Sequence, residues 1–215
     1  MAKISLKENV YNSLVKDIIS GIYAPNAILT ENEMMLKFEC SKAPIREALI
    51  ELCKDNYLKS IPRLGYIVVS YTLKEIVDIL DFRIDLETSN LKRLLPSVTD
   101  KQLEDFKSSY ENFKKNKINQ GSVAENWFNN QHFHLELCKL SGNEYVYNVL
   151  KHLLRQNSGF FAQYYSYAWH NDTESRGYFH ELILEALFER DLEKTCTLLT
   201  TDINSVKIQI QKALQ

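Results

Sequence analysis

The stretch Cys40–Leu52 reads CSKAPIREALIEL and predicts a short helix with two unlike faces. Ser41 is placed to cap it through its hydroxyl, and Pro44 falls in the first turn, where its missing N–H is tolerated. The inner face repeats apolar residues at helical spacing: Ile45, Ala48, Leu49 and Leu52. Three residues lie off that face near the N-terminal end: Lys42, Ala43 and Arg46. Such a helix is shaped to enter a DNA major groove, although alone it also fits an ordinary amphipathic surface helix.

The composition predicts a soluble, mostly helical protein of one or two domains. Of 215 residues, 45% are hydrophobic and 25% charged, and the six glycines and four prolines are few for a sandwich or barrel. No apolar run is long enough to span a bilayer, the N-terminus has no signal-peptide core, and the four cysteines form no CxxC pair. We therefore expect a cytoplasmic protein with reduced cysteines and no membrane partner.

The charge is unevenly divided along the chain. A net charge of −2 excludes a strongly basic nucleic-acid binder as a whole. Residues 1–70 carry 9 Lys and Arg against 8 Asp and Glu, whereas the remaining residues carry 17 against 20. The N-terminal part is therefore slightly more suited to an anionic partner.

The elements around the quoted stretch predict a winged helix-turn-helix. A helix is expected over residues 7–20 with Gly21 at its C-terminal end, and Thr30 with Glu33 forms the capping-box pattern of a second helix. Two short β-prone runs, residues 57–61 and 66–69, follow the quoted helix and predict a hairpin. Three helices followed by a two-stranded wing are far more specific than any one of these elements.

From Thr72 onward the pattern is helical only. Helices are expected over residues 72–95, 99–115, 123–140, 144–156, 173–189 and 192–212. We therefore predict a mainly α fold: an N-terminal winged helix-turn-helix with a small β-hairpin wing (residues 1–70), then an all-α helical-bundle domain (residues 72–215).

Residues 10–69 resemble the DNA-binding domain of the GntR family of bacterial transcription regulators, and SKAPIREAL closely resembles the family's recognition-helix signature. The matching residues are Val10, Leu14, Ile18, Gly21, Pro25, Leu29, Glu33, Ser41, Pro44, Ile45, Arg46, Glu47, Ala48, Leu49, Leu52, Leu58, Pro62 and Gly65. The sequence departs from the family at Asn26, where Gly is preferred, at Lys42, where Arg is preferred, and at Asn56, where Gly is usual.

By this resemblance, the residues expected at the DNA are Asn32, Ser41, Lys42, Ala43, Arg46, Arg63 and Gly65. Arg46 is the expected guanine contact, and Ser41 and Lys42 would hold the backbone. Gly65 would let the wing approach the minor groove, with Arg63 beside it. The alternative for Arg46 is a salt bridge to a neighbouring carboxylate. One such helix reads few base pairs, so a homodimer on a palindromic operator is implied.

Residues 73–210 resemble the all-helical FCD effector-binding domain of the FadR-type branch, in its shorter, VanR-like form. The matching residues are Arg83, Glu87, Phe133, His134, Ser141, Gly142, Asn143, His180, Ile183, Ala186, Leu187 and Asp191. Such domains hold a divalent metal on four side chains, usually Asp, His, His and His. The corresponding residues here are Asn130, His134, His180 and Asp202, a rearranged set that still suits zinc, nickel or manganese. The alternative is a pair of hydrogen-bonded core histidines without metal.

The resemblance also implies a small carboxylate effector, with Arg83, Asn130 and Tyr164 as its expected contacts. The fork of Arg83 suits a carboxylate, and its alternative role is a structural pair with Glu87. The sequence therefore predicts a DNA-binding regulator, and a repressor rather than an enzyme. Two alternatives use the His and Asp cluster: a metal-ion sensor, and a metal-dependent hydrolase, which lacks a clear general base.

Overall fold

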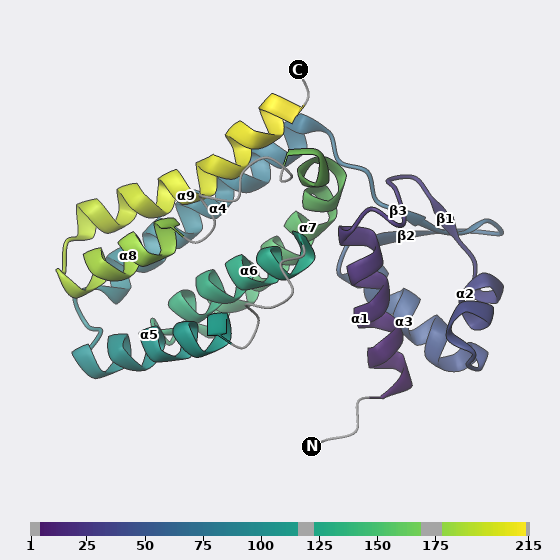
Figure 1. Cartoon of the computed structure of the whole chain (residues 1–215), viewed down its shortest axis with the longest axis horizontal. Helices are drawn as coiled ribbons and strands as arrows, with labels where there is room; N and C mark the ends of the chain where they lie inside the picture. The colour runs from purple at the N-terminus through teal and green to yellow at the C-terminus, as the bar shows by residue number, and fades with distance from the viewer. Residues whose placement is uncertain (1–4, 116–122, 169–177, 214–215) are drawn as a thin grey trace. The chain divides into compact units, whose positions relative to one another are not determined.

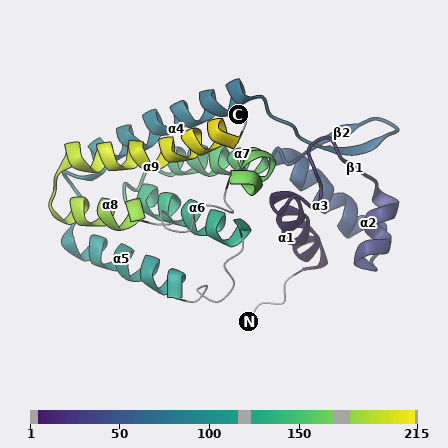
Figure 2. The ribbon, with the colours of Figure 1, turned by 45° about the horizontal axis from the view of Figure 1, so that its top comes forward.

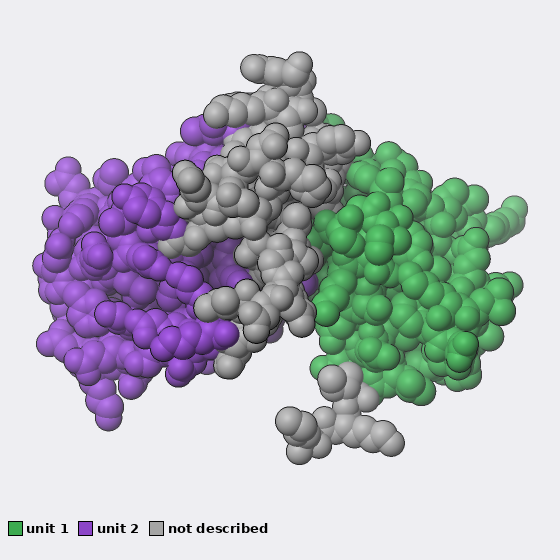
Figure 3. Space-filling view, viewed as in Figure 1, with its two compact units in different colours: residues 1–72, 155–166 green, residues 73–154, 167–215 purple. Residues whose placement is uncertain are grey.

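The computed structural model describes three stretches of the chain: residues 5–115, 123–168 and 178–213. Within them the protein forms helices α1 to α9 and strands β1 to β3 (Figure 1). The chain divides into two units, residues 1–72 with 155–166 and residues 73–154 with 167–215 (Figure 3). None of the described helices is long and apolar enough to cross a bilayer.

The first helix, α1 (Leu6–Ile19), ends as its sequence predicts. Ser5 caps its start by accepting from the N–H of Glu8. Gly21 follows the helix in the left-handed region (φ 77°), and its N–H donates to the carbonyl of Ile18. Glycine adopts this conformation without the steric penalty of a side chain, so the predicted C-terminal end is confirmed.

Helices α2 (Glu31–Phe38) and α3 (Lys42–Lys54) begin differently. The capping box predicted for α2 is confirmed: Thr30 Oγ1 accepts from the N–H of Glu33, and the Glu33 carboxylate accepts from the N–H of Thr30. Ser41 occupies the N-cap position of α3, but its side chain makes no capping hydrogen bond, so that prediction was wrong. Pro44 stands at the third helical position and has no N–H to donate, so it removes one of the two donors that an N-cap side chain can use.

The apolar face predicted for α3 is buried. Its four inner residues are fully buried, each with 0% exposure: Ile45, Ala48, Leu49 and Leu52. They pack mainly toward α1, with α2 on the other side of α3 (Figure 2). Full burial of each larger aliphatic side chain contributes about 1.5–3 kcal/mol, which fixes the rotation of α3 about its axis.

The wing is a three-stranded antiparallel sheet in the order β1-β3-β2. The predicted hairpin is confirmed as β2 (Leu58–Ile61) and β3 (Gly65–Val68). The sequence reading missed β1 (Ile28–Leu29), which is two residues long and pairs with β3. Gly65 has φ 122°, and a Cβ there would lie 2.6 Å from the carbonyl oxygen of Leu29. Only glycine therefore fits where β1 meets β3.

The second part of the chain is helical, as predicted, so the mainly α fold class is confirmed. The helices are α4 (Leu73–Leu94), α5 (Asp100–Lys115), α6 (Val123–Lys139), α7 (Glu144–Ala168), α8 (Tyr178–Phe188) and α9 (Leu192–Ala213). Helix α9 packs against α4 and α8, and α5 packs against α6 and α8.

Two helix boundaries differ from the sequence reading. Helix α7 was expected to end near Gln156 but continues to Ala168. A single glycine inside a helix costs only about 1 kcal/mol relative to alanine, so Gly159 does not end it. The helix expected from Thr173 begins at Tyr178 among the described residues, and residues 169–177 lie outside them.

Gly65→Ala should lower the free energy of unfolding by more than the strained φ alone, which costs about 1–3 kcal/mol. The added loss comes from the clash with the Leu29 carbonyl. Urea unfolding of Gly65→Ala and Gly21→Ala measures the difference, since Gly21 has positive φ but nothing within 4 Å of its Cβ position. Equal losses in the two variants would show that β1 does not press on Gly65.

Candidate functional site

The polar end of α3 is exposed while its opposite face is buried. The four residues predicted there are all exposed: Ser41, Lys42, Ala43 and Arg46. Because Ser41 makes no capping bond, its hydroxyl and the first-turn N–H groups are suited to an external anion. The start of α3 is therefore a surface that can accept a phosphate.

A shallow hollow of about 380 Å³ lies between this end of α3, the start of α2 and the wing. It contains four of the residues predicted at the DNA: Asn32, Lys42, Arg63 and Gly65. Arg63 stands at the tip of the hairpin with φ 66°, an uncommon conformation outside glycine. The structure thus brings residues from three separate segments to one side of the first unit.

Glu31 is the residue of this surface that sequence reasoning missed. Its Oε1 lies 2.9 Å from Arg46 Nε, and its Oε2 lies 2.9 Å from Lys42 Nζ. The hydrogen bond with Lys42 is the largest cause that lowers the pKa of Glu31, and Arg46 adds to it against burial. The salt bridge named as the alternative for Arg46 is therefore present.

Tyr66 completes the surroundings of this carboxylate. Burial raises the pKa of the Tyr66 hydroxyl, and the charge of Glu31 raises it further. Neither Glu31 nor Tyr66 belongs to the quoted stretch. The available signal for Glu31 was its place directly after Thr30, in the first turn of the helix that precedes α3.

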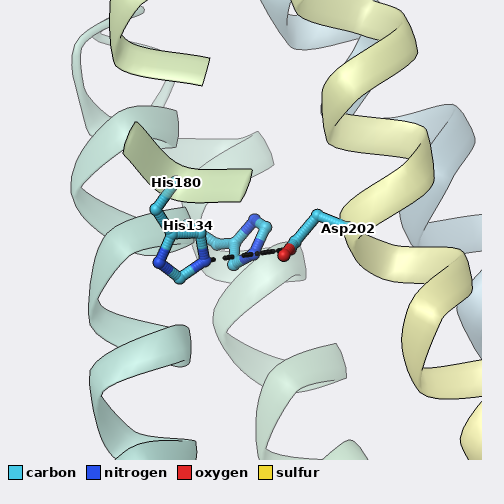
Figure 4. Close-up of side chains that lie close together, drawn as sticks. All are labelled: His134, His180 and Asp202. Carbon is cyan, nitrogen blue, oxygen red and sulfur yellow. Dashed lines mark hydrogen bonds and ion pairs between the residues drawn. The ribbon is translucent and has the colours of Figure 1, made fainter. Parts of the chain in front are cut away.

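The second candidate site is a buried polar cluster in the helical unit. It contains Arg83 and Glu87 from α4, Asn130 and His134 from α6, His180 from α8 and Asp202 from α9. Glu87 accepts from Arg83 Nε and lies 2.7 Å from His134 Nδ1. His134 Nε2 lies 3.0 Å from Asp202 Oδ2 (Figure 4). The four residues expected to bind metal and the Arg83–Glu87 pair thus form one network.

His180 is held from both sides. Its Nδ1 lies 3.2 Å from the Tyr110 hydroxyl, and its Nε2 lies 3.2 Å from Asn130 Nδ2 and 3.8 Å from Asp202 Oδ2. Phe133 stacks on the imidazole with centroids 4.0 Å apart. Tyr110 is 70 residues away in sequence, and the sequence reading gave it no role.

The orientation of the rings fits a divalent metal. Glu87 and Tyr110 engage the Nδ1 atoms, so both Nε2 atoms are turned toward Asp202. One ligand atom each from His134, His180 and Asp202 can be chosen so that all lie within 4.8 Å of one another. Oxygen partners on the second ring nitrogen are the usual support of metal-binding histidines. The amide oxygen of Asn130 is buried and, among the described residues, has no hydrogen-bond partner.

The charges of the cluster favour ionised carboxylates. Burial opposes the charge of Asp202, but His180 and His134 lower its pKa to about 2. Burial likewise opposes the charge of Glu87, and Arg83 with His134 lowers its pKa. Burial and Arg83 disfavour the imidazolium of His134, yet Glu87 and Asp202 outweigh them and raise its pKa. Burial is the main cause that lowers the pKa of His180 to about 4.

Arg83 shows features of both roles expected for it. Its pair with Glu87 is present, and the side chain is 1% exposed. Its Nη2 is buried and has no hydrogen-bond partner among the described residues. A cavity of about 10 Å³, near the room for one water molecule, lies beside Glu87 and His134. The side chain of Tyr164, the third expected effector contact, lies outside the described residues.

Comparisons with known proteins agree on the family for both parts of the chain. The family model described as "Bacterial regulatory proteins, gntR family" matches residues 6–68, and the model described as "FCD domain" matches residues 78–205.

Relatives from Bacillus, among them two described as gluconate operon transcriptional repressors, match part of the chain. An uncharacterized HTH-type transcriptional regulator of Bacillus subtilis, YdhC, is 32% identical over 143 residues, 66% of this chain and 64% of that protein. The gluconate operon transcriptional repressor of Bacillus licheniformis is 31% identical over 136 residues, 63% of this chain and 55% of the repressor. The chain thus spans less than two thirds of the length of either relative.

Solved structures share the fold. Escherichia coli McbR/YncC superposes with a TM-score of 0.77 at 20% identity, covering 99% of this chain and 100% of that one. A transcriptional regulator from Rhodococcus superposes with a TM-score of 0.68, also at 20% identity, over 96% of this chain and 98% of that one.

Glu87→Ala should destabilise the protein by about 3–5 kcal/mol, because it leaves Arg83 and His134 buried beside a missing carboxylate. Glu87→Gln keeps an acceptor and should lose less. Thermal unfolding measures both variants against Glu104→Ala, which removes an exposed carboxylate from α5. If Glu87→Ala unfolded at the temperature of Glu104→Ala, the cluster would not contribute to stability as described.

Proposed function

We propose that this chain, which belongs to the gntR family of bacterial regulatory proteins and carries an FCD domain, is a repressor controlled by a small carboxylate metabolite. Its family makes it a transcription regulator and not an enzyme. In this proposal residues 1–70 bind the DNA, and residues 72–215 bind the effector and form a homodimer. Relatives described as repressors support the sign of regulation. The protein acts in the bacterial cytoplasm, where its operator is.

The exposed N-terminal end of α3 carries the proposal. Burial of the opposite face fixes the helix so that Arg46 and Lys42 point away from the core. The guanidinium of Arg46 can donate to O6 and N7 of a guanine in the major groove. Ser41, Lys42 and Ala43 lie beside it, where a hydroxyl, an ammonium and a free N–H can hold a phosphate.

The wing and α2 extend the same surface. Asn32 at the start of α2 and Arg63 at the hairpin tip line the hollow with Lys42. Arg63 is placed to enter a neighbouring minor groove, where a narrow A·T-rich segment attracts a cation. One unit of this size reads a single half-site, so two copies on a palindrome with half-sites about 34–36 Å apart complete the operator.

The buried cluster is the proposed effector site. Arg83 Nη2 has no acceptor among the described residues, and a carboxylate supplies the acceptor that a guanidinium pairs with best. The Bacillus relatives described as gluconate operon repressors make sugar acids the first candidates. The effector acts only insofar as it binds one arrangement of the dimer better than another.

His134, His180 and Asp202 are the proposed ligands of a divalent metal, with Asn130 beside them. Zinc, nickel and manganese accept imidazole and carboxylate ligands. The ion would supply positive charge for the effector's carboxylate. A regulator whose effector is the ion itself is the alternative.

Arg46→Ala should weaken binding to the protein's own DNA site by about 1–3 kcal/mol, because it removes a base contact. The site is a duplex that the wild-type protein selects from a random-sequence pool. Titrations compare this duplex with a scrambled one, for Arg46→Ala and for Lys54→Ala, which removes an exposed cation from the other end of α3. Equal losses on both duplexes, or the same loss in Lys54→Ala, would contradict the role of Arg46.

Metal should bind and stabilise the protein. Elemental analysis should find about one ion per chain, and metal at 100 times its dissociation constant adds about 2.7 kcal/mol of stability. For a chain of this size that raises the melting temperature by about 5–10 °C. His180→Ala should lose the shift, and His152→Ala, which changes an exposed histidine of α7, should keep it.

Melting measurements and DNA-binding titrations together distinguish the two candidate effectors. A further shift by gluconate that depends on Arg83 and on metal supports the carboxylate. DNA release by metal alone supports the ion. A folded wild-type protein that binds no zinc, nickel or manganese would refute the metal site.

A further inference from the structure

We propose that Glu31 is a positioning residue for sequence readout: its carboxylate orients Arg46 and Lys42 for the base and the phosphate and lowers binding to wrong sequences. The inference rests on the proposed function, because it assigns Glu31 a part in reading DNA through Arg46.

The position of Glu31 is fixed by local structure. It is the first residue of α2, directly after Thr30, and the capping box between Thr30 and Glu33 holds the backbone there. From this point its two oxygens reach two different side chains of α3, Oε1 to Arg46 Nε and Oε2 to Lys42 Nζ, each at 2.9 Å. One carboxylate therefore serves both cations of the recognition surface.

Exposure separates the carboxylate from the cations. The side chain of Glu31 is 17% exposed, whereas Arg46 is 59% and Lys42 57% exposed. The acid thus lies behind the cations, toward the protein, and the cations lie in front, toward solvent. Both cations can therefore meet DNA while they remain in contact with Glu31.

The atom that Arg46 uses for this pair matters for base recognition. Nε lies on the inner edge of the guanidinium, and Glu31 binds that edge. The two terminal nitrogens form the fork that donates to guanine O6 and N7. Holding Nε therefore aligns the fork and removes rotamer freedom that an unheld arginine would lose only on binding.

The negative charge of Glu31 should also reduce non-specific binding. Affinity for any duplex grows with the positive charge brought to the phosphates. Glu31 cancels one of the two charges contributed by Lys42 and Arg46. A wrong sequence has no guanine for the aligned fork of Arg46, so there the carboxylate only reduces the attraction to phosphate and weakens the complex. In the correct complex the aligned fork binds the guanine, so the carboxylate strengthens it.

The test is the ratio of affinities for the selected duplex and the scrambled duplex. Glu31→Gln should lower this ratio about tenfold, by weakening the first complex and strengthening the second. The loss should concentrate at the guanine that Arg46 contacts, and adding Glu31→Gln to Arg46→Ala should lower the ratio little further. Melting temperatures should stay within a few degrees, because exposed ion pairs contribute little to stability.

Glu33→Gln is the matched control. It removes the same charge from the same helix turn, but its side chain binds Thr30 rather than α3, and glutamine also serves in a capping box. This variant should keep the wild-type affinity ratio. If it lowered the ratio as much as Glu31→Gln, net charge and not positioning would explain the effect.

Two other outcomes would overturn the inference while leaving the proposed function standing. Glu31→Gln could raise affinity equally for both duplexes, which would make Glu31 a competitor for phosphate and not a positioning residue. It could also leave both affinities unchanged, which would make the ion pair passive. A wild-type protein that selects no sequence, or an Arg46→Ala variant that binds like wild type, would instead refute the proposed function and this inference with it.

Discussion

Burial of one face of α3 decides what the opposite face can do. The helix has a single favourable rotation about its axis, which buries Ile45, Leu49 and Leu52. Turning it by a third of a full rotation would expose these side chains to water, at a cost of several kcal/mol, about 1.5–3 kcal/mol for each. That rotation points Arg46 and Lys42 outward and brings them within reach of Glu31. The proposed DNA-reading surface is thus a consequence of core packing.

Features that depend on neighbouring residues were predictable from the sequence. Thr30 and Glu33 are three residues apart, so their capping box follows from local geometry. The failure of Ser41 to cap also has a local cause, because Pro44 removes the donor that a third-position N–H supplies. The strand β1 was missed because two residues carry no periodicity, and its partner β3 lies far along the chain.

In the two candidate sites, too, some contacts were predictable from the sequence and others were not. The family pattern indicated which residues of α6, α8 and α9 would meet, and the structure places His134, His180 and Asp202 together. It did not indicate that Tyr110 would hold the second nitrogen of His180, or that Glu31 would bind two cations of the next helix. Both contacts join residues on different helices, and helix packing alone sets their distances.

The buried cluster is stable as a hydrogen-bonded network and is also suited to an ion. His134 lies between the carboxylates of Glu87 and Asp202, and Arg83 pairs with Glu87 from the other side. A metal on His134 and Asp202 would use the atoms that now bind each other. The proposed metal-bound state would therefore lack this hydrogen bond between His134 and Asp202.

The contact between Arg46 and a guanine can be tested at the level of single atoms. In the selected duplex, each guanine is replaced in turn by 7-deazaguanine, which lacks the N7 acceptor. The account predicts that one replacement per half-site weakens the wild-type complex by about 1 kcal/mol, roughly fivefold, and leaves the Arg46→Ala complex unchanged. If no guanine mattered, or if the loss were the same without Arg46, the N-terminal end of α3 would not read the base.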